Sequence, residues 1–131
     1  MTFGGNGVYR APEFSWLQTI GPTALKFLNS DSLGKQYQNT IFMGDVNTGR
    51  LYNFKLNEDR TGLALPPTSL ISNKTANTPD EMEEQQQQQG EEGQVILGHG
   101  FGPITDIQIG PDDGYLYILT LNGNIYRIVP S

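Results

Sequence analysis

The chain has 131 residues, the length of one domain, and contains no cysteine, which excludes disulfides, thiolate zinc sites and cysteine nucleophiles. Its formal net charge of −6 repels phosphate groups and argues against a nucleic acid or an anionic membrane as partner. Sixteen glycines, six tyrosines and six phenylalanines are typical of many short strands joined by tight turns.

Period-two or fully apolar runs predict three strands in the first half of the chain. They span residues 23–28, 39–46 and 50–56. Asn47-Thr48-Gly49 supplies a tight turn between the second and third of them. In the third strand Tyr52, Phe54 and Leu56 share one face, so this apolar set can line a core.

A polar tract follows these strands. Residues 72–93 hold six of the fourteen acids and five consecutive glutamines at 85–89, with Ala76 and Met82 as their main apolar side chains. Such a segment cannot bury enough surface to offset its ordering entropy, so a flexible Gln/Glu-rich surface insertion is predicted. A polyglutamine interaction motif is the alternative. Without these six acids, the remaining eight acids balance the eight bases of the chain, so the ordered part is expected to be nearly neutral.

The same order of strands returns near the C-terminus. Strands are predicted at 104–109, 115–120 and 124–129. The run Asn124-Ile125-Tyr126-Arg127-Ile128 repeats the pattern of Arg50-Leu51-Tyr52-Asn53-Phe54, each after an Asn/Gly turn. With the insertion removed, the repeat has the spacing of about 40 to 50 residues that is typical of a propeller blade.

These patterns predict an all-β fold, a partial β-propeller of about two four-stranded antiparallel blades of a six-bladed type. The first blade is residues 22–71 plus 94–98, with Val95-Ile96-Leu97 as its outer strand, and the last blade is residues 103–131. Residues 1–131 are expected to be a single propeller-like domain or a fragment of one. The blades are expected to pack face to face and to bury the apolar residues Leu25, Phe27, Ile41, Phe42, Tyr52, Phe54, Ile107, Ile109, Leu116, Ile118, Tyr126 and Ile128.

Few side chains suit catalysis. His99 is the only histidine, so a His-rich metal site is excluded, and neither a catalytic nor a metal-binding residue is assigned. Because His99 lies between two glycines at a strand end, it is expected to be a turn residue, with ligand contact as the alternative. Residues 57–62 cluster oxygens that could hold calcium, but they lack the spacing of a helix-flanked calcium loop and are predicted to form a hairpin loop.

Two blocks of sequence carry a family resemblance. One is Ile104-Thr105-Asp106-Ile107-Gln108-Ile109-Gly110-Pro111-Asp112-Asp113-Gly114-Tyr115-Leu116-Tyr117-Ile118-Leu119-Thr120, closed by Gly123-Asn124-Ile125-Tyr126-Arg127-Ile128. The other joins residues 22–28, 37–45 and 49–54. Together they resemble the last two blades of the glucose/sorbosone dehydrogenase family, soluble quinoprotein sugar dehydrogenases that fold as six-bladed β-propellers. The resemblance implies a periplasmic or secreted protein.

The same resemblance implies a site for pyrroloquinoline quinone (PQQ), a tricarboxylate, assisted by calcium. Two arginines of the family correspond to Pro103 and Thr105 here, and a lysine of some members corresponds to Asn47. Since these positions offer none of the three cationic contacts, no cofactor is predicted for this chain. If this face binds a ligand, the polar groups expected there are Asp45, Asn47, His99, Thr105 and Asp106, although Asp45 and Asp106 are expected rather to brace turns.

Two hypotheses about function follow. The first is a binding or structural module of propeller blades without activity of its own. The alternative is the C-terminal part of a PQQ-dependent aldose or sorbosone dehydrogenase, an oxidoreductase whose catalytic histidine lies in earlier blades. Two blades leave sheet faces and edges exposed, so the expected partners are further copies of the chain, as a cyclic trimer or a dimer, or upstream blades of a longer protein. Carbohydrate is the candidate small ligand.

Overall fold

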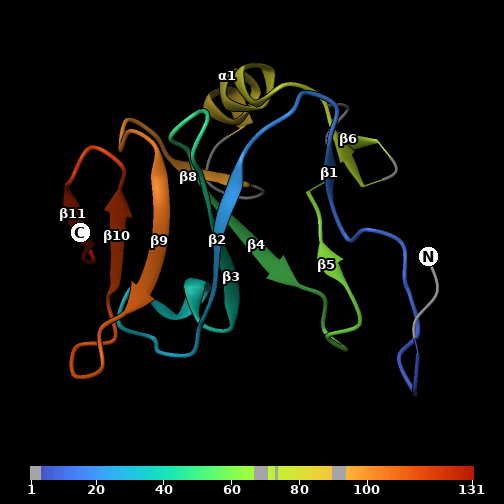
Figure 1. The fold of residues 1–131 in the computed structure, drawn as a ribbon, viewed down its shortest axis with the longest axis horizontal. Helices are drawn as coiled ribbons and strands as arrows, with labels where there is room; N and C mark the ends of the chain where they lie inside the picture. The colour runs from blue at the N-terminus through green and yellow to red at the C-terminus, as the bar shows by residue number, and fades with distance from the viewer. Residues whose placement is uncertain (1–3, 67–70, 73, 90–93) are drawn as a thin grey trace.

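The computed structural model describes residues 4–66, 71–72, 74–89 and 94–131 (Figure 1). Strands account for 38% of it and helices for 11%, so the fold is mainly β. In chain order the elements are β1 Ser15–Trp16, β2 Pro22–Leu28, the 3-10 turn η1 Lys35–Tyr37, β3 Thr40–Asp45, β4 Leu51–Leu56, β5 Leu63–Ala64, β6 Ile71–Ser72, β7 Thr75–Ala76, α1 Pro79–Gln89, β8 Ile96–Gly98, β9 Ile104–Ile109, β10 Leu116–Thr120 and β11 Ile125–Ile128.

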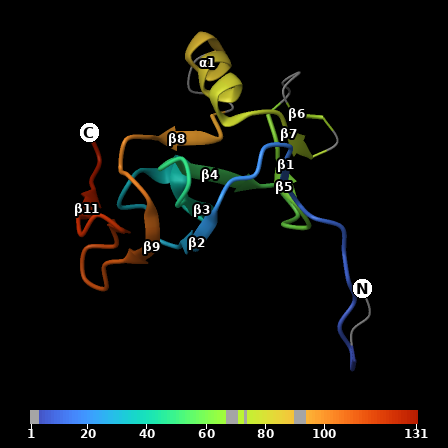
Figure 2. The same cartoon turned by 45° about the horizontal axis from the view of Figure 1, so that its top comes forward.

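The strands in the described part of the chain form three sheets. The first has the order β2-β3-β4-β5. β5 and β8 pair with the same edge of β4, β8 with its first residues and β5 with its last residues. The second sheet has the order β11-β10-β9 (Figure 1), and a small third sheet has the order β1-β7-β6 (Figure 2). The pairing of β8 with β4 confirms that the segment after the polar tract returns to the first sheet. Within the described ranges the sheets close into neither a barrel nor a propeller.

Side-chain alternation divides β3 and β4 between two cores. Ile41 and Met43 stand opposite Phe54 and Tyr52, so these four side chains share one face. Phe42 and Leu51 point to the opposite face, because successive side chains of a strand alternate. The assignment of Tyr52 and Phe54 to one core-lining face is therefore confirmed.

The inter-sheet core lies between the first and second sheets. Eight buried side chains form it: Leu28, Leu33, Phe42, Leu51, Ile104, Ile107, Leu116 and Ile118. The backbone of β3 approaches β9 closely there, since a Cβ added to Gly44 would collide with Cγ2 of Ile104. Face-to-face packing of the two sheets is confirmed, and the neighbouring strands β2 and β9 run side by side (Figure 2).

A second core covers the other face of the first sheet. Its buried members come from β3, β4 and β8 and from segments outside that sheet: Ile20, Met43, Tyr52, Phe54, Ala76, Met82, Val95 and Ile96. Phe14 and Trp16 pack against this core. We call it the groove-side core, because a groove lies on the same face of the sheet. The N-terminal segment and α1 therefore complete the first sheet, which sequence periodicity alone did not predict.

Three of the burial predictions are wrong. Leu25 and Phe27 on β2 are 60% and 48% exposed, and Tyr126 on β11 is 37% exposed. Leu25 and Phe27 lie on the groove-side face at its border strand, where no described element covers them, and Tyr126 lies on the border strand of the second sheet. Ile41, Ile109 and Ile128 are half-buried, and the other six predicted core residues are buried.

The prediction of a loop throughout 72–93 is also wrong. Residues 79–89 form α1, and Met82 on this helix is only 3% exposed (Figure 1). Thr75 and Ala76 lie in β7, which pairs with both β1 and β6. Residues 73 and 90–93 of the tract lie outside the described residues. Among the helices that the structure describes, none is long and apolar enough to cross a membrane.

Candidate functional site

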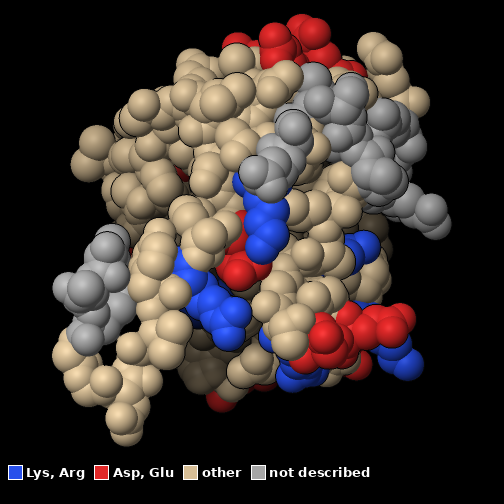
Figure 3. All heavy atoms as spheres, turned by 90° about the vertical axis from the view of Figure 1, so that its right-hand side faces the viewer, with Lys and Arg blue, Asp and Glu red and all other residues tan. Residues whose placement is uncertain are grey.

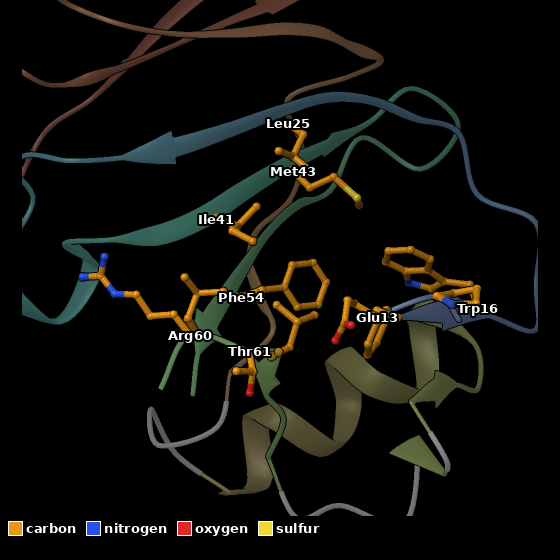
Figure 4. Close-up of a pocket in the computed structure, with 13 residues that line it drawn as sticks. Glu13, Trp16, Leu25, Ile41, Met43, Phe54, Arg60 and Thr61 are labelled. Atoms are coloured by element: carbon orange, nitrogen blue, oxygen red, sulfur yellow. The ribbon is translucent and has the colours of Figure 1, made fainter. Parts of the chain in front are cut away.

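A groove lies on the exposed part of the groove-side face (Figure 4). Its volume is about 540 Å³, and its walls are contributed by the segment before β1, by β1 itself, by the sheet β2–β4 and by the turn between β4 and β5. Its lining residues are Pro12, Glu13, Phe14, Trp16, Leu25, Ile41, Met43, Phe54, Leu56, Arg60, Thr61, Gly62 and Leu63. Most of these side chains are apolar, so the groove suits an apolar surface better than a charged ligand.

Aromatic rings form one wall of the groove. The ring centroids of Phe14 and Trp16 are 4.7 Å apart at an interplanar angle of 74°, and those of Phe14 and Phe54 are 5.0 Å apart. Trp16 also makes an edge-to-face contact with Tyr52 at 5.5 Å. Such contacts hold rings in defined orientations. The ring of Phe54 projects into the space between Trp16 and Ile41, as Figure 4 shows.

The polar rim of the groove is tied to its own neighbourhood. Lys74 Nζ donates to Glu13 Oε2 at 3.1 Å, and Figure 3 shows charges of both signs interspersed on this side of the molecule. In the turn between β4 and β5, Asn57 Oδ1 accepts hydrogen bonds from the Thr61 and Gly62 amides at 2.9 and 3.2 Å. The Thr61 hydroxyl, followed by its amide, lowers the pKa of Asp59. Since β4 and β5 pair antiparallel, the predicted hairpin loop is confirmed.

A second polar cluster joins α1 to the first sheet. Arg50 Nε donates to Glu83 Oε2 at 3.0 Å, and Arg50 also pairs with Asp80. Glu83 Oε1 lies 3.0 Å from His99 Nδ1. Burial lowers the pKa of Arg50, but its hydrogen bonds to Glu83 and Asp80 outweigh this and raise the pKa above its usual value. The Glu83 carboxylate therefore lies between the Arg50 guanidinium and the His99 imidazole, which is a cation only when protonated.

The described residues of this cluster include no hydroxyl or thiol nucleophile. A carboxylate beside an imidazole can orient a general base, but a base needs a hydroxyl, thiol or water to activate. The adjoining cavity measures about 140 Å³, and its described lining residues are Glu83, Gln86, Gln87, Gln94, Ile96, Leu97, Gly98 and His99. The contacts that the described residues show are the ion pairs of Arg50 with Glu83 and Asp80 and the contact of Glu83 with His99.

The five residues predicted for a ligand face bond mostly to their own neighbours. Asp45 is fully buried, and its carboxylate accepts from the Gly21 and Asn47 amides at 2.9 and 2.8 Å and from the Thr48 hydroxyl. Thr105 donates to the Leu119 carbonyl at 3.2 Å. Asp106 accepts from the Ile107 amide and the Gln108 side chain. His99 lies beside α1, and only Asp45 and Asn47 are joined by a hydrogen bond.

The hydrogen bonds of Asp45 and Asp106 therefore stabilise the local backbone, as predicted for these two residues. Asp45 holds the turn after β3, and Asp106 bonds within its own strand. Asn47 is exposed and His99 has a side chain that is 69% exposed, so both are accessible to solvent. Contact of any of the five with a ligand stays a prediction.

The positions implied for PQQ do not fit a tricarboxylate. Asn47 and Pro103 are uncharged, and Thr105 uses its hydroxyl on the Leu119 carbonyl. Arg50, close to Asn47 in sequence, is engaged by Glu83 and Asp80. A trianion needs unpaired cations, which these residues do not offer. Among the described residues, no group of three or more His, Cys, Asp or Glu side chains is placed to hold a metal ion.

The groove residues Glu13, Phe14 and Trp16 were not identified by sequence reasoning. The available signal was the single tryptophan of the chain, close to a phenylalanine in a segment with no strand-length periodicity. Large aromatic side chains that lie outside a predicted strand usually pack against a neighbouring sheet. This pattern indicates that the segment with Phe14 and Trp16 covers a sheet face.

No family model, no curated protein and no solved structure matches this chain. The site is therefore interpreted from its own geometry, and the resemblance to sugar dehydrogenase blades stays a hypothesis.

Proposed function

We propose that this chain is a non-catalytic binding module of two propeller-like blades, similar to the C-terminal blades of glucose/sorbosone dehydrogenases, that binds further copies of itself. The observation that carries the proposal is the exposure of Leu25 and Phe27, at 60% and 48%, on the groove-side face of the first sheet. Large adjacent apolar side chains on a sheet face are typical of a surface that another element covers.

The second sheet offers a complementary surface. Leu119 and Ile125 stand opposite each other on β10 and β11 and are 41% and 70% exposed. They lie on the face of the second sheet turned away from the inter-sheet core, since Leu116 and Ile118 point into that core. Each copy thus carries one exposed apolar surface on its first sheet and another on its second sheet.

Head-to-tail contact between copies would bury both faces. Within one chain, the first and second sheets already pack face to face through the inter-sheet core. Repeating that kind of contact between chains places the outer face of one copy's second sheet on the groove of the next. Such heterologous contacts form rings when the rotation closes, and about six blades at two per copy favour a cyclic trimer, with a dimer as the alternative.

The test uses one disruptive variant for each face. Leu25→Glu places a charge on the groove side, Ile125→Glu places one on the outer face of the second sheet, and Asn29→Glu is a matched control on an exposed loop. Mass is measured by light scattering after size exclusion at micromolar concentrations. We expect an oligomer for the wild type and Asn29→Glu, and monomers for Leu25→Glu and Ile125→Glu alone.

Mixing the two monomeric variants separates head-to-tail from two-fold association. Each variant retains the face that the other has lost, so an equimolar mixture should form a heterodimer and nothing larger. A two-fold dimer through the groove would be lost in Leu25→Glu and kept in Ile125→Glu, and this result would overturn the head-to-tail contact. A wild type that stays monomeric at these concentrations would overturn the proposal itself.

A further inference from the structure

The free edge of β8 is occupied by a side chain of α1. β8 pairs with β4 on one side, and the Asn53 amide donates to the Val95 carbonyl at 2.8 Å on that side. On the other side, Gln86 Oε1 accepts from the Val95 and Ile96 amides at 2.7 and 3.0 Å. Gln86 Nε2 donates to the Ile96 carbonyl at 3.2 Å. The side-chain amide thus bonds both backbone polar groups of Ile96, as a neighbouring strand would.

α1 is held mainly by polar contacts. Its sequence is Pro-Asp-Glu-Met-Glu-Glu followed by five Gln, and its buried apolar side chains are Pro79 in the first turn and Met82. Arg50 binds Glu83 and Asp80, and His99 binds Glu83 from the turn after β8. The acidic side chains of α1 account for the negative charge at the top of Figure 3. With so little apolar burial, the hold on this helix depends on hydrogen bonds and ion pairs.

We propose that α1 is a releasable edge guard that keeps β8 from pairing with the β8 of a second copy. An exposed strand edge is a template for another strand, and two identical edges can pair antiparallel about a two-fold axis. Gln86 blocks this pairing at Ile96, and Figure 2 shows α1 directly beside β8. The proposal is independent of the groove, which lies on a face of the sheet, whereas the guard lies at its edge.

The first test measures amide hydrogen exchange at Val95 and Ile96 by NMR. Gln86→Ala removes the guarding amide, and Gln87→Ala is the matched control on the exposed neighbouring position. We expect Gln86→Ala to speed exchange at both amides by about tenfold, because several hydrogen bonds are lost together, while Gln87→Ala stays at the wild-type rate. The Asn53 amide, on the other side of β8, serves as the internal reference. Unchanged protection of Ile96 in Gln86→Ala would overturn the proposal.

The second test concerns the ion pairs that hold the guard. Glu83→Gln removes the charge shared by Arg50 and His99, and Glu84→Gln changes an exposed neighbour by the same amount. Raising salt from about 50 to about 500 mM should speed exchange at Ile96 several-fold in the wild type and in Glu84→Gln. In Glu83→Gln exchange should already be fast at low salt and change little. Equal responses in both variants would contradict an electrostatic hold.

The third test measures edge pairing itself. In a Leu25→Glu background, which removes association through the groove, Gln86→Ala should raise the average mass toward a dimer, whereas Gln87→Ala should leave a monomer. A Gln86→Ala chain that exchanges faster yet stays monomeric at up to millimolar concentration would show that α1 guards nothing, and would overturn the proposal. This result leaves the groove proposal untouched, because Leu25→Glu disables the groove in both chains.

Discussion

Leu25 and Met43 are direct cross-strand partners on β2 and β3, yet Leu25 is 60% exposed and Met43 only 6%. The two side chains point to the same face of the same sheet. Met43 is covered because it packs in the groove-side core with Tyr52 and Ile20, whereas no described element covers Leu25. The border of the groove-side core thus runs between two neighbouring residues, both of which line the groove.

This difference predicts unequal costs for the same truncation. Met43→Ala should lower the free energy of unfolding by about 2–5 kcal/mol, because it opens a cavity in a packed core. Leu25→Ala should change it by no more than about 0.5 kcal/mol in the monomer, because its side chain is mostly in solvent. Chemical denaturation at concentrations low enough to keep the chain monomeric measures both, and equal losses would contradict the assigned border.

Gly44 is expected to tolerate no side chain. A Cβ at this position would collide with Cγ2 of Ile104, inside the inter-sheet core. Gly44→Ala should therefore destabilise the fold by about 1–3 kcal/mol through overpacking. Gly4→Ala is the control, since a Cβ at Gly4 would have no neighbour within 4 Å. Thermal and chemical denaturation give the comparison, and a neutral Gly44→Ala would mean that the sheets are farther apart than described.

Asp45 is expected to be a structural carboxylate. It is fully buried and accepts from the Gly21 amide, the Asn47 amide and the Thr48 hydroxyl. Asp45→Asn keeps the size but turns one acceptor into a donor facing these donors, so a loss of about 1.5–3 kcal/mol is expected. Asp112→Asn, on an exposed turn, is the control. Wild-type stability in Asp45→Asn would contradict the bracing role.

Tyr52 should make the fold sensitive to alkali. Burial, with a further contribution from the charge of Asp45, raises the pKa of Tyr52 from 10.0 to about 12. Because the folded chain holds this proton more tightly than the unfolded chain, the stabilising effect is complete below pH 10 and is lost as the pH rises toward 12. The wild type should lose about 2–3 kcal/mol across this interval relative to Tyr52→Phe, which has no phenol to titrate. The free energy of unfolding of both chains is measured by denaturation at each pH. The same pH dependence in the wild type and in Tyr52→Phe would refute the prediction.

We expect no PQQ binding at micromolar concentration and no sugar-dependent dye reduction by this chain. Asn47, Pro103 and Thr105 supply no cation, and the loss of the two arginine contacts at Pro103 and Thr105 alone weakens affinity by about two to four powers of ten. Absorbance titration with the quinone and calcium, followed by a dye assay with glucose, checks this against a quinoprotein dehydrogenase as positive control. Saturable binding with turnover would instead support the dehydrogenase alternative.

The helix at 79–89 illustrates why part of the fold was missed. Its sequence has a proline at the first position and acids in the first turn, both of which favour a helix start. These signals were outweighed by the lack of an apolar stripe, since Met82 is its main apolar side chain. The helix is stabilised instead by Arg50 and by the edge of β8, which are partners that no local pattern contains.

The main strands and their alternation were determined by the sequence alone. Period-two runs identified β2, β3, β4, β9, β10 and β11, and the alternation of Leu51 and Tyr52 assigned each to a different face. This succeeds because strand periodicity is a local property of consecutive residues. The groove, with Trp16 beside Phe54, was decided only by the tertiary structure. Whether an apolar face becomes core or surface depends on which distant segment covers it, and local periodicity carries no information about that.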